Sequence, residues 1–179
     1  MISISDIKNI APKVFQNSLQ KKVYTVLDKL SIQFERVDTD EVITMEDCAA
    51  VNEKLNMKMV KTLFLCNRQQ TEFYLFVTKG DKPFRSKDFS SVLGISRVSF
   101  APVELMETML CTKIGAATIF SSIIDTNNKV HIVLDKAILS EKYYGCSDGV
   151  TTSYMKVQTD DIVNKLLPFT NHIATIIEV

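Results

Sequence analysis

The segment 59–87 constrains the fold most, because it holds two strongly apolar stretches joined by a short polar turn. Its pattern predicts strands over 59–66 and 72–77, and two neighbouring strands with a short loop are most simply an antiparallel hairpin. A loop rich in Lys and Arg, 79–87, follows the second strand. The rest of the chain is therefore expected to build on an antiparallel or mixed sheet.

One charged residue lies inside the first of these strands. Side chains alternate between the two faces of a strand, so Lys61 shares a face with Leu63 and Leu65. Burying an unpaired ammonium group is expensive. Lys61 must therefore either extend its amine to solvent past its own aliphatic stem or line a polar cavity. The strand pattern leaves both interpretations open.

The rest of the chain alternates predicted strands with single helices. Apolar residues at helical spacing predict a helix that is capped by Ser18, and Thr44 with Asp47 resembles a capping box for a helix that ends near Leu55. Small and apolar residues predict a second hairpin, 116–124 with 130–134, and the segment 143–149 is predicted to be a turn. Further strands are predicted over 34–37, 97–101, 153–157 and 175–179, and further helices over 86–93, 102–110, 136–140 and 159–167.

This pattern places the chain in the α+β class, with a mixed, mostly antiparallel sheet. Its 179 residues fit one domain, 1–179, in which 1–17 is an N-terminal lead-in. The 21 basic and 21 acidic residues cancel, so no global field draws nucleic acid to the protein. Any contact with RNA must therefore come from a local basic cluster.

The cysteines and histidines give no support for a metal site. Cys48, Cys66, Cys111 and Cys146 form no C-x-x-C pair, and the chain has only two histidines. Free thiols, no secretory signal and no apolar run of about 20 residues predict a cytoplasmic protein without a membrane partner. Cys66 and Cys146 are candidate nucleophiles, but neither has a sequence neighbour that would lower its pKa.

Several ungapped segments then follow one another in a recognisable order. They are KTLFLCN at 61–67, FYLFVTKGDKPFRSKDF at 73–89, LGISRVSFAPVELME at 93–107 and GAATIF at 115–120. In order and spacing they resemble the free-standing relatives of the editing domain inserted in bacterial prolyl-tRNA synthetases, which are called YbaK or ProX proteins. The resemblance extends from about residue 20 to the end of the sequence.

Members of that family are aminoacyl-tRNA deacylases, which hydrolyse the ester between a wrong amino acid and the terminal ribose of a tRNA. The resemblance implies that this chain uses no metal or other cofactor. It implies a compact fold whose sheet is partly closed into a barrel with flanking helices. It also implies that the partner is the 3′ acceptor end of an aminoacyl-tRNA, with prolyl-tRNA synthetase as a further candidate.

The resemblance also assigns roles to residues. Lys61 opens the block that carries the family's pocket lysine, and Gly115 begins a Gly-x-x-x-Pro motif, so these two are the predicted catalytic residues. The sequence departs from the family where Thr62 replaces Asn, Ile119 replaces Pro and Ser147 replaces His. The predicted substrate-binding residues are Thr62, Ala116, Ala117, Thr118, Ser147 and His172.

The basic loop is the candidate tRNA-binding surface. Lys79, Lys82, Arg85 and Lys87 are predicted to contact phosphates near the acceptor end, although an ordinary solvated loop would have the same composition.

Three functions remain open from the sequence. The first is a trans-editing hydrolase that deacylates mischarged tRNA, above all alanyl-tRNA specific for proline. The second is a protein of the same fold that binds the tRNA end without turnover, which the changes at Thr62 and Ser147 would fit. The third is a thiol-dependent enzyme that uses Cys146 or Cys66.

Overall fold

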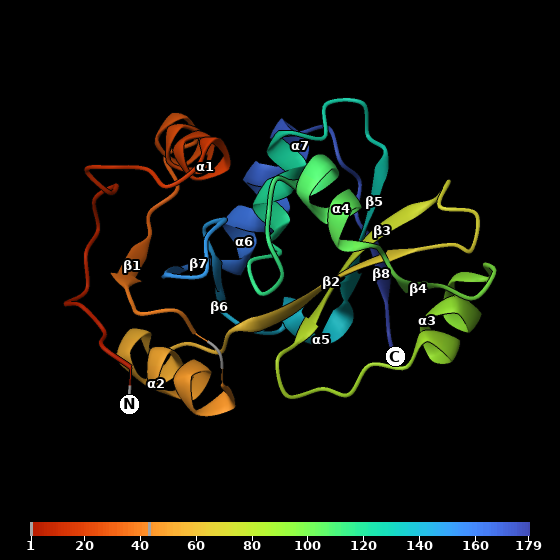
Figure 1. Ribbon diagram of the computed structural model, residues 1–179, viewed down its shortest axis with the longest axis horizontal. Coiled ribbons are helices and arrows are strands. Elements are labelled where there is room, and N and C mark those ends of the chain that lie inside the picture. Colours follow the sequence, from red (N-terminus) through yellow and green to blue (C-terminus); the bar gives the residue numbers. More distant parts are fainter. Residues whose placement is uncertain (1, 43) are drawn as a thin grey trace.

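The computed structural model describes residues 2–42 and 44–179, which form two sheets flanked by helices (Figure 1). The smaller sheet is antiparallel, in the order β1-β7-β6, and the larger is mixed, in the order β4-β2-β3-β5-β8. The strands are β1 Glu35–Asp38, β2 Val60–Cys66, β3 Phe73–Lys79, β4 Ser99–Phe100, β5 Val130–Asp135, β6 Tyr143–Ser147, β7 Ser153–Gln158 and β8 Thr175–Ile177.

The predicted hairpin is confirmed as the pair β2 and β3, which run antiparallel in register from Val60↔Lys79 to Cys66↔Phe73. The two faces of β2 meet different apolar clusters. Phe64 packs in the main cluster with α1, whereas Leu65 packs with Phe89 of α3 on the opposite face. Because both faces are covered, β2 and β3 are nearly continuous apolar runs.

The second predicted hairpin is wrong. Strand β5 pairs in parallel with β3 and with β8, and residues 116–124 form a loop and a 3₁₀ helix, Ile119–Ile123. The side chain of Thr118 caps that helix by accepting a hydrogen bond from the backbone N–H of Phe120. The small apolar residues that resemble a strand are instead buried as a short helix.

The predicted turn at 143–149 is also wrong over most of its length, because 143–147 is strand β6. Gly145 makes this possible. A Cβ atom at this position would lie 2.5 Å from Sδ of Met57 and 3.1 Å from the carbonyl oxygen of Lys58. Gly145 also forms the parallel bridge to Met59 that joins the two sheets, while neither sheet closes into a barrel over the described residues.

The helices agree in place with the predictions and differ at their ends. The side chain of Asn17, rather than Ser18, caps α1, whereas the capping box of Thr44 and Asp47 is confirmed for α2. The last helical region continues through Pro168, which lies in the first turn of α7. The helices are α1 Ser18–Lys29, α2 Met45–Leu55, α3 Ser86–Leu93, α4 Val103–Leu105, α5 Lys136–Leu139, α6 Thr159–Asp161 and α7 Leu167–Phe169, with π-helical turns at Met106–Leu110 and Ile162–Leu166.

The N-terminal segment before α1 runs along β1, through bridges from Ile4 to Thr39 and from Lys8 to Arg36. The observed fold is thus a compact α+β unit with one antiparallel sheet and one mixed sheet. Over the residues described, no helix has the length and apolar character that a membrane crossing requires.

Candidate functional site

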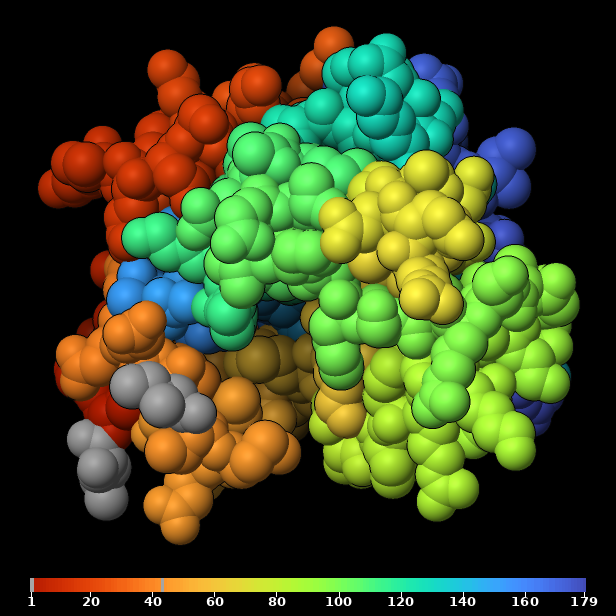
Figure 2. All heavy atoms as spheres, turned by 45° about the vertical axis from the view of Figure 1, so that its right-hand side comes forward, coloured from red at the N-terminus to blue at the C-terminus, as the bar shows by residue number. Residues whose placement is uncertain are grey.

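Two adjoining cavities open beside the start of β2. The first, here called the Gly115 cavity, has a volume of about 420 Å³, and the second, the Lys61 cavity, about 430 Å³. Met59 and Val60 line both cavities, so the two share a wall. Figure 2 shows a recess on this face, bordered by α2 in orange and by the green segment that includes α4, with the gold start of β2 on its floor.

The Gly115 cavity is assembled from segments far apart in the sequence. Strand β2 contributes Thr62 and Phe64, and the segment from β4 to the π-helical turn contributes Phe100 and Met106. Ser147 comes from β6. The walls are therefore mainly apolar, with a few polar groups, which is typical of a small-molecule site.

The loop at Gly115 carries backbone N–H groups beside this cavity. Gly115 has a φ of +87°, which an L-residue adopts only with strain, and it is exposed. The N–H of Ala116 donates to the carbonyl of Lys113, whereas those of Gly115 and Ala117, both at the cavity wall, find no acceptor in the part of the chain that the structure describes. Two N–H groups are thus available to a negatively charged oxygen.

Lys61 lies in the neighbouring cavity. It is half-buried, and its Nζ donates a hydrogen bond to the carbonyl oxygen of Lys82 in the loop after β3. Lys58, Lys79 and Glu141 line the same cavity. The structure therefore does not bring Lys61 and Gly115 to one cavity, and of the two predicted catalytic residues only Gly115 lines the same cavity as Thr62.

The remaining predicted substrate-binding residues divide into two groups. Thr62, Ala117 and Ser147 line the Gly115 cavity, while Ala116 and Thr118 are buried and do not line it. The hydroxyl of Ser147 is already engaged, since it donates to the carbonyl of Val150 at 2.7 Å and accepts from the N–H of Gly149 at 3.0 Å.

His172 belongs to a buried contact outside both cavities. Its Nε2 lies 2.9 Å from Oδ2 of Asp125, and its Nδ1 lies 3.0 Å from Oγ1 of Thr170. The same Asp125 carboxylate accepts backbone N–H bonds from Lys129 and Val130. The contact ties the turn before β5 to the loop after α7, which is a structural arrangement.

The four basic side chains of the loop differ in whether they already form an ion pair within the protein. Nζ of Lys82 lies 2.7 Å from Oδ2 of the buried Asp135, and Nζ of Lys79 lies 3.0 Å from Oε1 of Glu141. Burial alone would raise the pKa of Asp135, but the bonds from Lys82, Ala137 and Thr78 lower it below its usual value. Arg85 and Lys87 are exposed.

A family model described as the aminoacyl-tRNA editing domain matches residues 39–165.

The chain belongs to the aminoacyl-tRNA editing domain family.

Two curated relatives agree with this assignment. The prolyl-tRNA editing protein ProX of Acetoanaerobium sticklandii is 27% identical over 120 residues, which cover 67% of this chain and 73% of that protein. The prolyl-tRNA synthetase associated domain-containing protein 1 of Danio rerio is 24% identical over 161 residues, covering 89% and 86%. The predicted resemblance to the YbaK and ProX proteins is therefore confirmed.

The fold is also found in solved structures. A crystal structure described as a candidate trans-editing enzyme for prolyl-tRNA synthetase superposes with a TM-score of 0.63 at 14% identity, over 92% of this chain and 99% of that one. At this identity the likeness shows the shared editing-domain fold alone.

The thiols of this editing-domain chain are poorly suited to nucleophilic chemistry. Cys146 lines the Gly115 cavity but is buried, and burial raises the pKa of its thiol, so the reactive thiolate is disfavoured. Burial likewise raises the pKa of Cys66. Over the described residues, no three His, Cys, Asp or Glu side chains are grouped as ligands for a metal ion.

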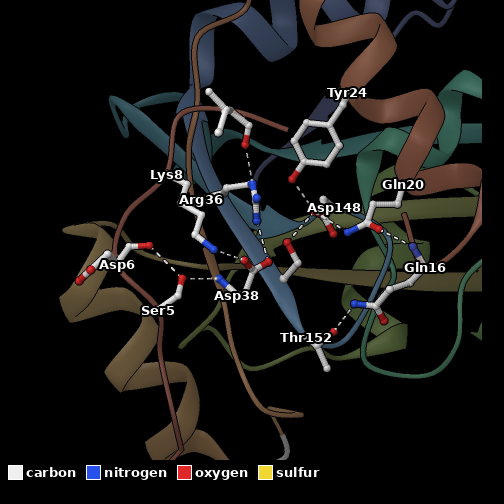
Figure 3. Close-up of polar contacts among 12 residues, drawn as sticks. Ser5, Asp6, Lys8, Gln16, Gln20, Tyr24, Arg36, Asp38, Asp148 and Thr152 are labelled. Carbon is white, nitrogen blue, oxygen red and sulfur yellow. Dashed lines mark hydrogen bonds and ion pairs between the residues drawn. The ribbon is translucent and has the colours of Figure 1, made fainter. Parts of the chain in front are cut away.

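A buried polar cluster next to the site was not predicted from the sequence. Oδ2 of Asp148 accepts hydrogen bonds from Gln20, Tyr24 and Ser153 (Figure 3). Burial raises the pKa of Asp148, with a smaller opposing effect from those bonds and from Arg36. The cluster links α1 to the turn that follows Ser147, and no local pattern around Asp148 indicates partners more than 120 positions away.

Proposed function

We propose that this chain is a trans-editing hydrolase that removes a wrong amino acid from tRNA, with alanyl-tRNA specific for proline as its principal substrate. The family assignment supports the editing role, and the names of the two relatives point to proline. A synthetase pocket built for proline cannot strongly reject a slightly smaller amino acid, because one methylene is worth only about 1–3 kcal/mol. A separate hydrolase can then remove the wrong amino acid from the tRNA.

The observation that carries the proposal is the pair of free N–H groups at Gly115 and Ala117 on the wall of a largely apolar cavity. In ester hydrolysis, the oxygen of a water molecule bonds to the carbonyl carbon, and the former carbonyl oxygen becomes a negatively charged oxyanion. Fixed N–H donors that meet this charge stabilise the transition state more than the ground state. Collapse of this intermediate re-forms the carbonyl and breaks its bond to the ribose oxygen. The ribose oxygen takes up a proton lost by the added water, so that the free amino acid and the ribose hydroxyl are the products.

Lys61 enters the proposal as a positioning residue. Its hydrogen bond to the Lys82 carbonyl fixes the loop after β3, and its charge lies one wall away from the ester site. From the Lys61 cavity an ammonium group would attract the phosphate backbone of the substrate. Arg85 and Lys87, which are exposed, are the proposed phosphate contacts of the basic loop.

A second candidate function is supported by Ser147. Its hydroxyl is engaged by backbone groups of the β6–β7 turn, so the side chain at this position of the cavity is not free to act on substrate. A protein with this feature could bind the tRNA end in a cytoplasmic setting without turnover, alone or beside prolyl-tRNA synthetase.

A deacylation panel decides between the two functions. Labelled alanine should be released from alanyl-tRNA(Pro) by the purified protein, whereas prolyl-tRNA(Pro) serves as the matched control and should stay charged. A release rate equal to that in buffer for every mischarged tRNA in the panel, together with retained binding of tRNA, would reject the hydrolase and leave the binding protein.

A further inference from the structure

The mouth of the Gly115 cavity carries an unusual set of exposed apolar side chains. Phe100 is 63% exposed, Ile114 is 68% exposed and Val103 is 42% exposed, and all three line this cavity. Single exposed apolar residues are common on protein surfaces, but a group of them around one opening marks a binding surface.

Phe100 is held in place by the backbone on which it lies. It pairs with Leu65 of β2, and the next residue, Ala101, donates its N–H to the carbonyl of Phe64 at 2.9 Å. Its ring packs edge-to-face on Phe84, with 5.9 Å between the ring centroids. The ring is therefore anchored on one side and open to solvent elsewhere, as a platform for a planar ligand requires.

The surroundings of this platform favour an anionic, planar partner. Phe84 belongs to the basic loop and directly precedes the exposed Arg85, and Lys113, close in sequence to Gly115, is exposed as well. Unpaired bases stack on aromatic side chains, while Arg and Lys meet the phosphates of the same strand. An apolar protein partner would gain nothing from these charges.

We propose that Phe100, flanked by Ile114, is the stacking platform for the unpaired base at the 3′ end of tRNA. The inference rests on the proposed function in one respect: if the ester lies at Gly115, the terminal base is only one ribose away and must lie at the cavity mouth. Phe100 thus orients the ester without touching it, and it is a positioning residue.

A binding experiment that involves no hydrolysis tests the platform. The probe is an uncharged acceptor-stem RNA in which 2-aminopurine replaces the terminal adenine, and its fluorescence falls when the base stacks. The native protein should quench the probe with saturation. Phe100→Ala should weaken binding about 5- to 100-fold and remove the quenching, since base–aromatic stacking contributes this much.

Two further variants make the result specific. Phe100→Tyr keeps an aromatic face and should quench the probe as the native protein does. Quenching reports stacking of the base itself, so it separates a stacking role of Phe100 from a merely structural one. Ile173→Ala removes a side chain that is 94% exposed and lines none of the cavities described above, so it should leave binding unchanged. Equal binding and quenching by the native protein and Phe100→Ala would overturn the inference.

The outcome is separable from that of the proposed function. Alanine release without quenching would keep the hydrolase and reject the platform. Quenching without release would keep the platform and reject the hydrolase.

Discussion

Replacing Gly115 with alanine tests whether the backbone at this position takes part in the reaction. The φ of +87° places Gly115 in a region that costs an L-residue about 1–2 kcal/mol. Space is not the obstacle, because the added Cβ would lie 3.7 Å from Cγ2 of Thr151, an ordinary contact. The expected loss of stability is therefore modest, about 2–4 °C in melting temperature for each kcal/mol.

The expected loss of activity is much larger. Relief of the strain must rotate the backbone around Gly115, and this moves the two unpaired N–H groups at Gly115 and Ala117. Loss of one oxyanion donor typically lowers kcat by about 10²–10³. Single-turnover release of alanine from alanyl-tRNA(Pro), measured well below the melting temperature, should therefore fall about 100-fold or more in Gly115→Ala.

The chain offers a matched control in Gly94, the residue that ends α3. Its φ is +65°, and a Cβ there would meet no heavy atom within 4 Å, so Gly94→Ala introduces comparable backbone strain outside the cavity. This variant should lower the melting temperature by a similar amount and leave deacylation unchanged. Equal losses of activity in both variants, or full activity in Gly115→Ala, would refute the assignment of the oxyanion donors to this loop.

Three further predictions concern residues around the site. Lys61→Met should raise KM for charged tRNA more than it lowers kcat, because the ammonium group lies in the adjoining cavity; a loss confined to kcat would place it on the ester instead. Asp148→Asn should change the pH dependence of urea unfolding. Burial raises the pKa of Asp148, so the contribution of Asp148 to the unfolding free energy should fall as pH rises from about 4, the usual value for Asp, through the folded-state pKa. That fall should be absent in the variant, and an unchanged pH profile would disprove the effect. His172→Ala should lower the unfolding free energy by about 1–3 kcal/mol by leaving buried Asp125 without one partner, yet deacylation should persist below the melting temperature; loss of turnover in a fully stable variant would return His172 to the substrate site.

Most of the fold could be predicted from local patterns. The β2–β3 hairpin and the capping box of α2 depend on residues close together in the sequence, and both are confirmed. The errors lie where a distant segment overrides the local pattern. Gly145 indicates a turn by itself, but the close approach of Met57 and Lys58 makes it the glycine of a strand.

The candidate site was only partly predictable for the same reason. Thr62, Ala117 and Ser147, which the family motifs single out, line one cavity with Gly115, and their part in binding substrate stays a prediction. The apolar mouth was missed, since Phe100 and Ile114 carry no signal until the fold places both at the same cavity. The sequence of the basic loop likewise predicts positive charge, but it does not indicate which of its Lys and Arg side chains form ion pairs with carboxylates of the protein.

The sequence alone therefore determined the family and the central hairpin, since order and local spacing are properties of the chain itself. Only the tertiary structure decided that Lys61 and Gly115 lie on opposite sides of a shared wall. It also decided that Lys82 is held by Asp135, 53 positions away. The interaction partner of a side chain depends on which segments are adjacent in space, and long-range strand pairing and packing determine which segments these are.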